Sequence, residues 1–271
     1  MTQPYLPPKR RFGQHFLEDT WVKKVVAAIK PKGTDLILEI GPGRGALTFP
    51  LAAQVQKVLA IEIDRALAEA LRLSANETME TVQADVLEVD LAAITTRLRT
   101  KSGLIRVVGN LPYNISAPIV LRLLRQGHSH GIFDATIMVQ REVGERVIAL
   151  PGSKQYGPLA VMSALHSSSK QLLSLPPGAF RPTPKVHSML IQLRFRHPER
   201  VPSNLKQFES FIRQLFTQRR KKISNALAAV MLPDPFDAQE CCSQSKIDPS
   251  IRPAELELTE LIDLYEVAAG H

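Results

Sequence analysis

The sequence has only two cysteines, one tryptophan and no long apolar run. Cys241 and Cys242 are adjacent, which suits neither a structural disulfide nor the spacing of a zinc site. The seven histidines show no metal spacing either. No apolar run approaches the length of a membrane span, and the basic start of the chain lacks the apolar segment of a signal peptide. We therefore expect no metal, no membrane partner and a location in the reducing cytoplasm.

The charge is basic and unevenly distributed, with a formal net value of +8. Residues 1–32 carry seven Lys or Arg against two acids, and residues 194–222 carry nine against two. The stretch from 33 to 100 is acidic or balanced. A solvated surface explains any one cluster, but two clusters in one chain favour a polyanionic partner such as nucleic acid.

Apolar runs alternate with helical patterns through the first two thirds of the chain. Strands are expected at 35–40, 57–61, 81–84, 104–109 and 132–139, and helices at 45–53, 65–73, 91–98, 119–125, 141–150 and 159–165. Two further strands, 171–175 and 189–195, flank a proline-rich segment, which is typical of a terminal hairpin. This order predicts an α/β fold with a mostly parallel seven-stranded sheet that ends in an antiparallel hairpin.

The alternation stops at 197–202, where two prolines and charged residues interrupt both periodicities. Beyond it, apolar residues follow helical spacing, from Phe208 to Val230 and again from Leu256 to Val267. We expect two domains. Residues 1–197 form the first, with a basic N-terminal arm at 1–32, and residues 198–271 form a small all-α C-terminal domain.

A glycine-rich segment at 39–45, with the sequence EIGPGRG, joins the first strand to a helix. Glycines let the backbone approach a ligand, and the start of a helix offers free N–H groups. Glu62 ends the second strand, where a carboxylate suits both hydroxyls of a ribose, and Asp85 closes the third, where it suits an adenine amino group. A nucleoside cofactor fits this arrangement. The glycines also fit the dinucleotide pattern of dehydrogenases, and either acid alone fits a solvated strand end.

The segment Asn110-Leu111-Pro112-Tyr113 follows the fourth strand. The amino group of adenine is a poor nucleophile because its lone pair is delocalised into the ring, so catalysis needs acceptors that hold its hydrogens. The Asn110 side-chain oxygen and the Leu111 carbonyl, fixed by Pro112, are candidate acceptors. Tyr113 and Phe180 are candidates to clamp a base taken out of its helix. The competing interpretations are a simple proline turn with a packed Tyr113, and a core position for Phe180.

Together, in this order, these features resemble the class I S-adenosylmethionine methyltransferases, since no dehydrogenase needs the Asn-Leu-Pro-Tyr element. The resemblance narrows to the ribosomal RNA adenine dimethyltransferases that act on the small subunit, a family with a Rossmann-like fold. Five segments carry it in family order: RRFGQHFL at 10–17, QREV at 140–143, SKQYGPL at 153–159, FRPTPKVHS at 180–188 and FTQRRKK at 216–222. Such a strip of motifs, within residues 9–225, is highly specific.

The resemblance implies N6,N6-dimethylation of two adjacent adenosines near the 3′ end of 16S rRNA in the immature small subunit, by a monomer that uses S-adenosylmethionine. Cofactor contacts are implied for His15, Leu17, Gly41, Gly43, Glu62, Asp85 and Asn110. RNA contacts are expected from Arg10, Arg11 and Lys185, and from a helical run at Arg219, Arg220, Lys221 and Lys222. The family often has Asn in place of His15 and an apolar residue in place of Arg44, and neither change disturbs the glycine turn.

Three alternatives stay open. Large-subunit rRNA adenine methylases share the front half and the Asn-Leu-Pro-Tyr motif, but usually lack the Phe-x-x-Arg-Arg-Lys segment and differ at the Pro-x-Pro-Lys loop. A ribosome-assembly factor that binds RNA, with catalysis secondary, would need only the basic ends of the chain. The cofactor acids and Asn110 argue against a purely non-catalytic role. A dehydrogenase is the weakest of the three.

Overall fold

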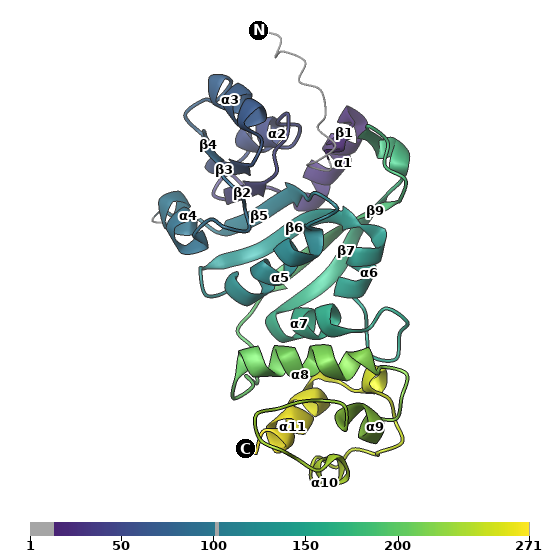
Figure 1. Cartoon of the computed structure of the whole chain (residues 1–271). Helices are drawn as coiled ribbons and strands as arrows, with labels where there is room; N and C mark the ends of the chain where they lie inside the picture. The colour runs from purple at the N-terminus through teal and green to yellow at the C-terminus, as the bar shows by residue number, and fades with distance from the viewer. Residues whose placement is uncertain (1–13, 101–102, 271) are drawn as a thin grey trace. The chain divides into compact units, whose positions relative to one another are not determined.

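The computed structural model describes residues 14–100 and 103–270, and it contains a seven-stranded sheet (Figure 1). The strands lie in the order β4-β3-β2-β5-β6-β9-β7. Their bounds are β2 Leu36–Ile40, β3 Lys57–Glu62, β4 Met79–Gln83, β5 Ile105–Asn110, β6 Ile132–Gln140, β7 Ser167–Leu175 and β9 Ser188–Phe195. The first five strands pair in parallel, whereas β9 is antiparallel to both β6 and β7. The expected sheet with a terminal hairpin is confirmed.

The strands form where apolar runs allow burial on both faces of the sheet. All five residues of β2 are buried, and so are Val58 to Glu62 of β3. Strand β7 differs from the expectation, because it begins at Ser167 instead of Gln171. Its polar start pairs with the far end of β9, Ser167 opposite Phe195, and backbone pairing extends the strand where no apolar pattern marks it.

The helices that follow the strands are α1 Asp19–Ile29, α2 Thr48–Ala52, α3 Arg65–Leu73, α4 Leu91–Leu98, α5 Ser116–Gln126 and α6 Arg141–Val147. Asp64 and Asp90 cap α3 and α4 through side-chain bonds to backbone N–H groups. Helix α2 starts later than the expected residue 45, because residues 43–47 form turns. Within the described ranges, no helix is both long and apolar enough to cross a membrane.

A second, two-stranded sheet was not predicted from the sequence. Strand β1 (Phe16–Leu17) pairs antiparallel with β8 (Phe180–Arg181), with Phe16 opposite Arg181 and Leu17 opposite Phe180. A short 3-10 turn, η2 (Pro177–Ala179), leads into β8. This pairing joins the N-terminal segment to the proline-rich segment between β7 and β9.

An ion-pair network ties the amino ends of three parallel strands together. Arg106 in β5 donates to Asp134 in β6 at 2.9 Å and to Asp35, which precedes β2, also at 2.9 Å. The same guanidinium donates to the carbonyl of Ile29 at the end of α1 at 3.0 Å. All three charged residues are buried. Loss of one partner from such a network leaves a buried charge unpaired, which costs roughly 3–5 kcal/mol.

The chain divides into two compact units. Unit 1 comprises Met1–Gly144 and Ser167–Arg196, and unit 2 comprises Glu145–His166 and His197–His271. The segment 145–166, which the sequence placed in the first domain, therefore lies with the C-terminal helices. The reason is packing within unit 2, where α7 (Pro158–His166) contacts α8 (Leu205–Thr217) and α11 (Leu258–Ala268). In addition, the buried Tyr156 hydroxyl donates to the Leu256 carbonyl at 3.0 Å.

Unit 2 also contains α9 (Ile223–Leu227), α10 (Ala238–Gln244) and a 3-10 turn, η3 (Pro253–Glu255). Its core is aromatic: the Phe208 and Phe211 rings of α8 meet the Tyr265 ring of α11 edge to face, at centroid distances of 5.4 Å and 5.6 Å. Cys241 and Cys242 are free, buried thiols in this unit. Burial raises the pKa of Cys241 to about 12, so this thiol stays protonated and unreactive at neutral pH.

Candidate active site

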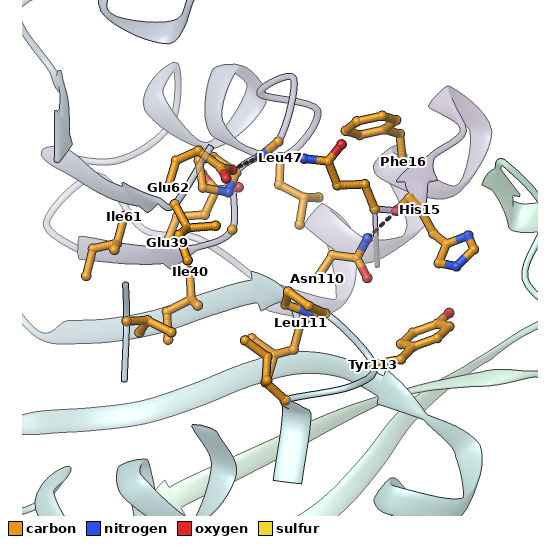
Figure 2. Close-up of a pocket in the computed structure, with 18 of the residues that line it drawn as sticks. His15, Phe16, Glu39, Ile40, Leu47, Ile61, Glu62, Asn110, Leu111 and Tyr113 are labelled. Carbon is orange, nitrogen blue, oxygen red and sulfur yellow. Dashed lines mark hydrogen bonds between the residues drawn. The ribbon is translucent and has the colours of Figure 1, made fainter. Parts of the chain in front are cut away.

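A cavity of about 250 Å³ lies where the parallel strands of unit 1 end (Figure 2). It is lined by the residues that follow β2, β3, β4 and β5, together with the N-terminal segment that includes β1. In numbers, these segments are 14–17, 39–43, 46–47, 61–63, 84–86 and 110–115. The carboxyl edge of a parallel sheet, where strand order reverses, is the usual ligand site of such folds.

The glycine turn between β2 and α2 has the backbone geometry that its glycines allow. Gly41 and Gly43 have φ values of 68° and 58°, a region that other residues rarely adopt. A side chain at Gly43 would also meet the Phe16 ring, because a Cβ there would lie 3.0 Å from the ring carbon Cε1. Phe16 therefore packs on the turn, and the Arg44 guanidinium covers the same ring at 4.2 Å from its centroid.

Glu62 lies at the end of β3 and lines the cavity. Its Oε2 accepts from the Gly43 N–H at 3.0 Å, and its Oε1 accepts from the Asp64 N–H at 2.9 Å. Burial raises the pKa of Glu62, while these two hydrogen bonds act in the opposite direction. Each carboxylate oxygen keeps a further acceptor position, so the carboxylate is fixed by the backbone and still able to bind ligand hydroxyls.

Glu39 is a site residue to which the sequence reasoning gave no role. It lies inside β2 and is almost fully buried, and burial raises its pKa to about 8, with repulsion from Glu62 adding to the effect. Glu39 lines the cavity, and its buried Oε2 has no hydrogen-bond partner among the described residues. The sequence feature that could have revealed Glu39 is the presence of an acidic residue inside an otherwise apolar strand. A buried carboxyl oxygen without a partner there suits a cationic or hydrogen-bond-donating ligand.

Asp85 lies just beyond β4, in the loop at 84–89, and lines the cavity. Its Oδ1 accepts from the Leu87 N–H at 2.8 Å, and its backbone carbonyl accepts from the Val89 N–H at 3.0 Å. Its Oδ2 has no hydrogen-bond partner in the described ranges. The position is consistent with the expected contact to an adenine amino group.

Asn110 ends β5, and its amide is held in one orientation. The Nδ2 group donates to the backbone carbonyl of His15 at 2.7 Å, which leaves Oδ1 as an acceptor at the cavity (Figure 2). The preceding position, Gly109, requires a glycine, because a Cβ there would lie 2.5 Å from the Ile40 carbonyl oxygen. Next along the chain, the Leu111 N–H donates to the Met138 carbonyl at 3.0 Å. The backbone that carries the two candidate acceptors is therefore anchored on both neighbouring strands.

Tyr113 stacks on His15, with ring centroids 5.3 Å apart and planes inclined by 24°. The tyrosine hydroxyl bonds to the Ser188 hydroxyl at 2.5 Å, and burial raises the Tyr113 pKa. On the other side, His15 Nδ1 lies 2.6 Å from the Pro182 carbonyl oxygen. Since a carbonyl only accepts, Nδ1 carries the proton. His15 thus joins the Asn110 to Tyr113 segment to the proline-rich segment.

The structure does not bring Phe180 to the cavity, which corrects the expectation of a clamp made by Tyr113 and Phe180. The Phe180 side chain is fully buried and packs in the core cluster that contains Leu17, Val26 and Leu190. The β1–β8 pairing, which the sequence did not reveal, turns this ring inward. The ring that stacks on Tyr113 at the cavity is instead that of His15.

The remaining cofactor residues from the sequence, His15, Leu17, Gly41 and Gly43, all line the cavity. Of the expected RNA contacts, Arg10 and Arg11 lie outside the described residues. Lys185 is exposed in the loop before β9. In the ranges that the structure describes, no cluster of three His, Cys, Asp or Glu side chains could hold a metal ion.

The basic run at 219–222 lies in unit 2 on a turn between α8 and α9, which corrects the expectation of a helix. Arg219 uses its guanidinium internally, donating to the Lys154 carbonyl at 2.8 Å and to the Ser153 carbonyl at 3.4 Å. Lys222 lowers the pKa of Asp248 by its charge, after the larger effect of hydrogen bonds from Ser250. Arg220 and Lys221 are exposed.

Solved structures share this fold. A dimethyladenosine transferase from Plasmodium falciparum superimposes with a TM-score of 0.75, at 22% identity, covering 94% of this chain and 98% of that one. The 23S rRNA methyltransferase ErmE superimposes with a TM-score of 0.68, at 25% identity, covering 93% and 99%. The fold and the cavity at its strand ends thus define a Rossmann-like methyltransferase, as the sequence predicted.

More specifically, the chain belongs to the ribosomal RNA adenine dimethylase family, which matches residues 7–269. Relatives named ribosomal RNA small subunit methyltransferase A include one from Xanthomonas axonopodis pv. citri, 40% identical over 265 residues and 96% of each chain. Another, from Coxiella burnetii, is 38% identical over 266 residues, 97% of this chain and 98% of its own. The family membership expected from the sequence motifs is confirmed.

Proposed function

We propose that this protein transfers methyl groups from S-adenosylmethionine to N6 of two adjacent adenosines near the 3′ end of small-subunit rRNA. The observation that carries the proposal is the fixed amide of Asn110, whose Oδ1 is left as an acceptor at the cavity. The choice of the small subunit is supported by relatives of that name at 38–40% identity over nearly the whole chain.

The cavity residues fit the cofactor chemically. The Glu39 carboxyl, buried with an unpartnered Oε2, suits a ligand that brings positive charge or hydrogen-bond donors. Glu62 would accept from the ribose hydroxyls, and Asp85 Oδ2 from the adenine amino group. His15, Leu17, Gly41 and Gly43 would supply the remaining contacts. When bound, S-adenosylmethionine supplies an electrophilic methyl group on a sulfonium.

The chain's own contribution to chemistry is positioning and hydrogen bonding. Asn110 Oδ1 and the Leu111 carbonyl would accept the two hydrogens of the adenine amine, drawing its lone pair out of conjugation so that it can attack the methyl carbon. In each transfer the amine nitrogen would gain one bond to carbon and would release one proton to water. Because Nδ2 is held by the His15 carbonyl, the acceptor needs no reorientation during the reaction.

Tyr113 and His15 would hold the extruded base by stacking, which contributes roughly 1–3 kcal/mol per base in comparable sites. After the first transfer one amine hydrogen remains, so one acceptor contact is replaced by space for a methyl group. The apolar lining from Leu111 and Pro112 suits that methyl.

RNA binding is proposed to use exposed cations. Arg220 and Lys221 on the turn of unit 2, and Lys185 in unit 1, are exposed and suited to phosphates. The set expected from the sequence also included Arg10, Arg11 and Lys222, which would join them. It included Arg219 as well, but the guanidinium of Arg219 is bonded internally. The proposed substrate is the immature small subunit, and the protein would act as a monomer in the cytoplasm.

The second candidate is methylation of large-subunit rRNA, favoured by the structural likeness to ErmE. In the experiment, undermethylated small subunits, large subunits and naked rRNA are incubated in separate samples with the protein and labelled S-adenosylmethionine. The RNA is then digested, and its nucleosides are identified by mass spectrometry. We expect N6,N6-dimethyladenosine in the small-subunit sample. Label in the large subunit alone would favour the second candidate. Binding to small subunits without methyl transfer would instead favour an assembly factor.

A further inference from the structure

The loop that carries Asp85 is anchored differently on its two sides. Before Asp85, the Ala84 N–H donates to the Glu62 carbonyl at 3.0 Å and continues the parallel pairing of β4 with β3. After Asp85 the strand pairing has ended, and the chain forms turns up to Val89. The position of the Asp85 carboxylate therefore depends on what holds the second half of the loop.

Arg122 holds that half from helix α5. Its Nη1 donates to the Val86 carbonyl at 2.8 Å, and its Nη2 donates to the Val89 carbonyl. Its Nε donates to Gln126 Oε1, one helical turn further on, at 3.3 Å, which fixes the direction of the side chain. The side chain is half-buried. A planar guanidinium that bridges two carbonyls fixes both their spacing and their direction.

These bonds bear directly on the cavity. Val86, whose carbonyl Arg122 binds, is buried and lines the cavity beside Asp85. Val89, whose carbonyl it also binds, closes the turn by donating its N–H to the Asp85 carbonyl. Arg122 itself does not line the cavity.

We propose that Arg122 is a positioning residue for cofactor recognition. It holds the 84–89 loop so that Asp85 Oδ2 meets the exocyclic amine of the cofactor's adenine. The inference rests on the proposed function, because it takes the nucleoside of S-adenosylmethionine as the ligand. It implies that the preference of the protein for adenine over a purine without the 6-amino group depends on Arg122.

The test measures two dissociation constants by calorimetry, one for S-adenosylhomocysteine and one for its analogue with hydrogen in place of the 6-amino group. The wild-type protein is expected to prefer the amino compound about tenfold, the value of one hydrogen bond to a charged group. In Arg122→Met this preference falls to about twofold or less, with little change in the affinity for the analogue. A general loss of structure would weaken both ligands alike and leave the ratio unchanged.

Two further variants complete the experiment. Arg122→Lys keeps a charged donor for one carbonyl and is expected to retain part of the preference, so it provides the test if Arg122→Met does not fold. Arg125→Met removes an exposed arginine from the same helix and should retain the full preference.

An unchanged preference in folded Arg122→Met or Arg122→Lys would overturn the inference and leave the proposed function intact. Absence of S-adenosylhomocysteine binding by the wild-type protein would overturn both. If the wild-type protein binds both compounds equally, Asp85 does not recognise the amine, and the inference about Arg122 is overturned.

Discussion

The side-chain amide of Asn110 donates from Nδ2 to the backbone carbonyl of His15 at 2.7 Å. The bond joins the end of β5 to the N-terminal segment across 95 residues of sequence. It also fixes the orientation of the amide, because a side chain whose nitrogen points to the His15 carbonyl directs its oxygen to the cavity. His15 also stacks on Tyr113 and bonds to Pro182. It therefore connects the N-terminal segment to both the 110–113 segment and the proline-rich segment.

Phe180 is expected to act as a core residue. Phe180→Ala should lower the free energy of unfolding by about 3–5 kcal/mol, because it leaves a cavity among tightly packed side chains. Phe180→Leu should cost less and should retain methyl transfer within a few-fold. Urea unfolding and initial rates of transfer measure the two effects. Loss of activity in a stable Phe180→Leu protein would contradict this assignment and would support a role for Phe180 in the active site.

Tyr113 is expected to act through its ring more than through its hydroxyl. Tyr113→Ala removes the stacking surface and should lower kcat/KM for RNA about 10- to 100-fold. Tyr113→Phe loses only the bond to Ser188 and should lower it a few-fold. The affinity for S-adenosylmethionine serves as the control and should remain close to that of the wild type in both. Equal losses of kcat/KM in the two variants would contradict the stacking role.

Glu39 should make stability depend on pH. Its pKa is raised to about 8 by burial, so the folded protein retains a proton that the unfolded chain releases near the ordinary value of 4.5. The free energy of unfolding should therefore fall as pH rises through this window, and should change no further from this cause above about pH 8. Glu62, whose pKa is also raised, contributes in the same direction.

Glu39→Gln should remove the Glu39 part of this fall and should be stabilising relative to the wild type at alkaline pH. Urea unfolding of both proteins across a range of about pH 5 to 9 measures the difference. Glu88→Gln, at an exposed position, is the matched control and should follow the wild-type curve. If the Glu39→Gln and wild-type curves run parallel, the buried carboxyl is not the cause.

The basic residues of the turn at 219–222 in unit 2 should have two different functions. Arg220→Gln and Lys221→Gln should each reduce the salt dependence of RNA binding by about one unit of slope, as loss of one phosphate contact does. Arg219→Gln should chiefly lower thermal stability, because Arg219 holds the carbonyls of Ser153 and Lys154. Filter binding at several salt concentrations and thermal unfolding distinguish them. A full unit of slope lost in Arg219→Gln would assign this side chain to phosphate as well.

Much of the fold was predictable because its strands are apolar on both faces. The runs around Leu38, Leu59 and Val107 have few alternatives to a buried parallel strand, and the glycine turn with Glu62 and Asp85 followed from the strand ends. The order of these acids along the chain is the order in which parallel strands deliver them to one edge.

The errors at the candidate site came from contacts between residues far apart in sequence. The β1–β8 pairing, which buries Phe180, joins residues separated by more than half of the chain, and neither two-residue strand has a periodic signal. His15 could be named as a cofactor residue, but its contacts with Asn110, Tyr113 and Pro182 depend on how three loops meet. The run at 219–222 looked helical because α8 continues almost to it.

The central claim is that the fixed Asn110 amide accepts the hydrogens of the adenine amine during methyl transfer. The most direct test is the rate of N6,N6-dimethyladenosine formation on undermethylated small subunits by wild type and Asn110→Ala, at saturating S-adenosylmethionine. We expect the rate to fall about 100-fold or more, as when one positioned transition-state hydrogen bond is removed. Equal methyl incorporation by the two proteins would contradict the account.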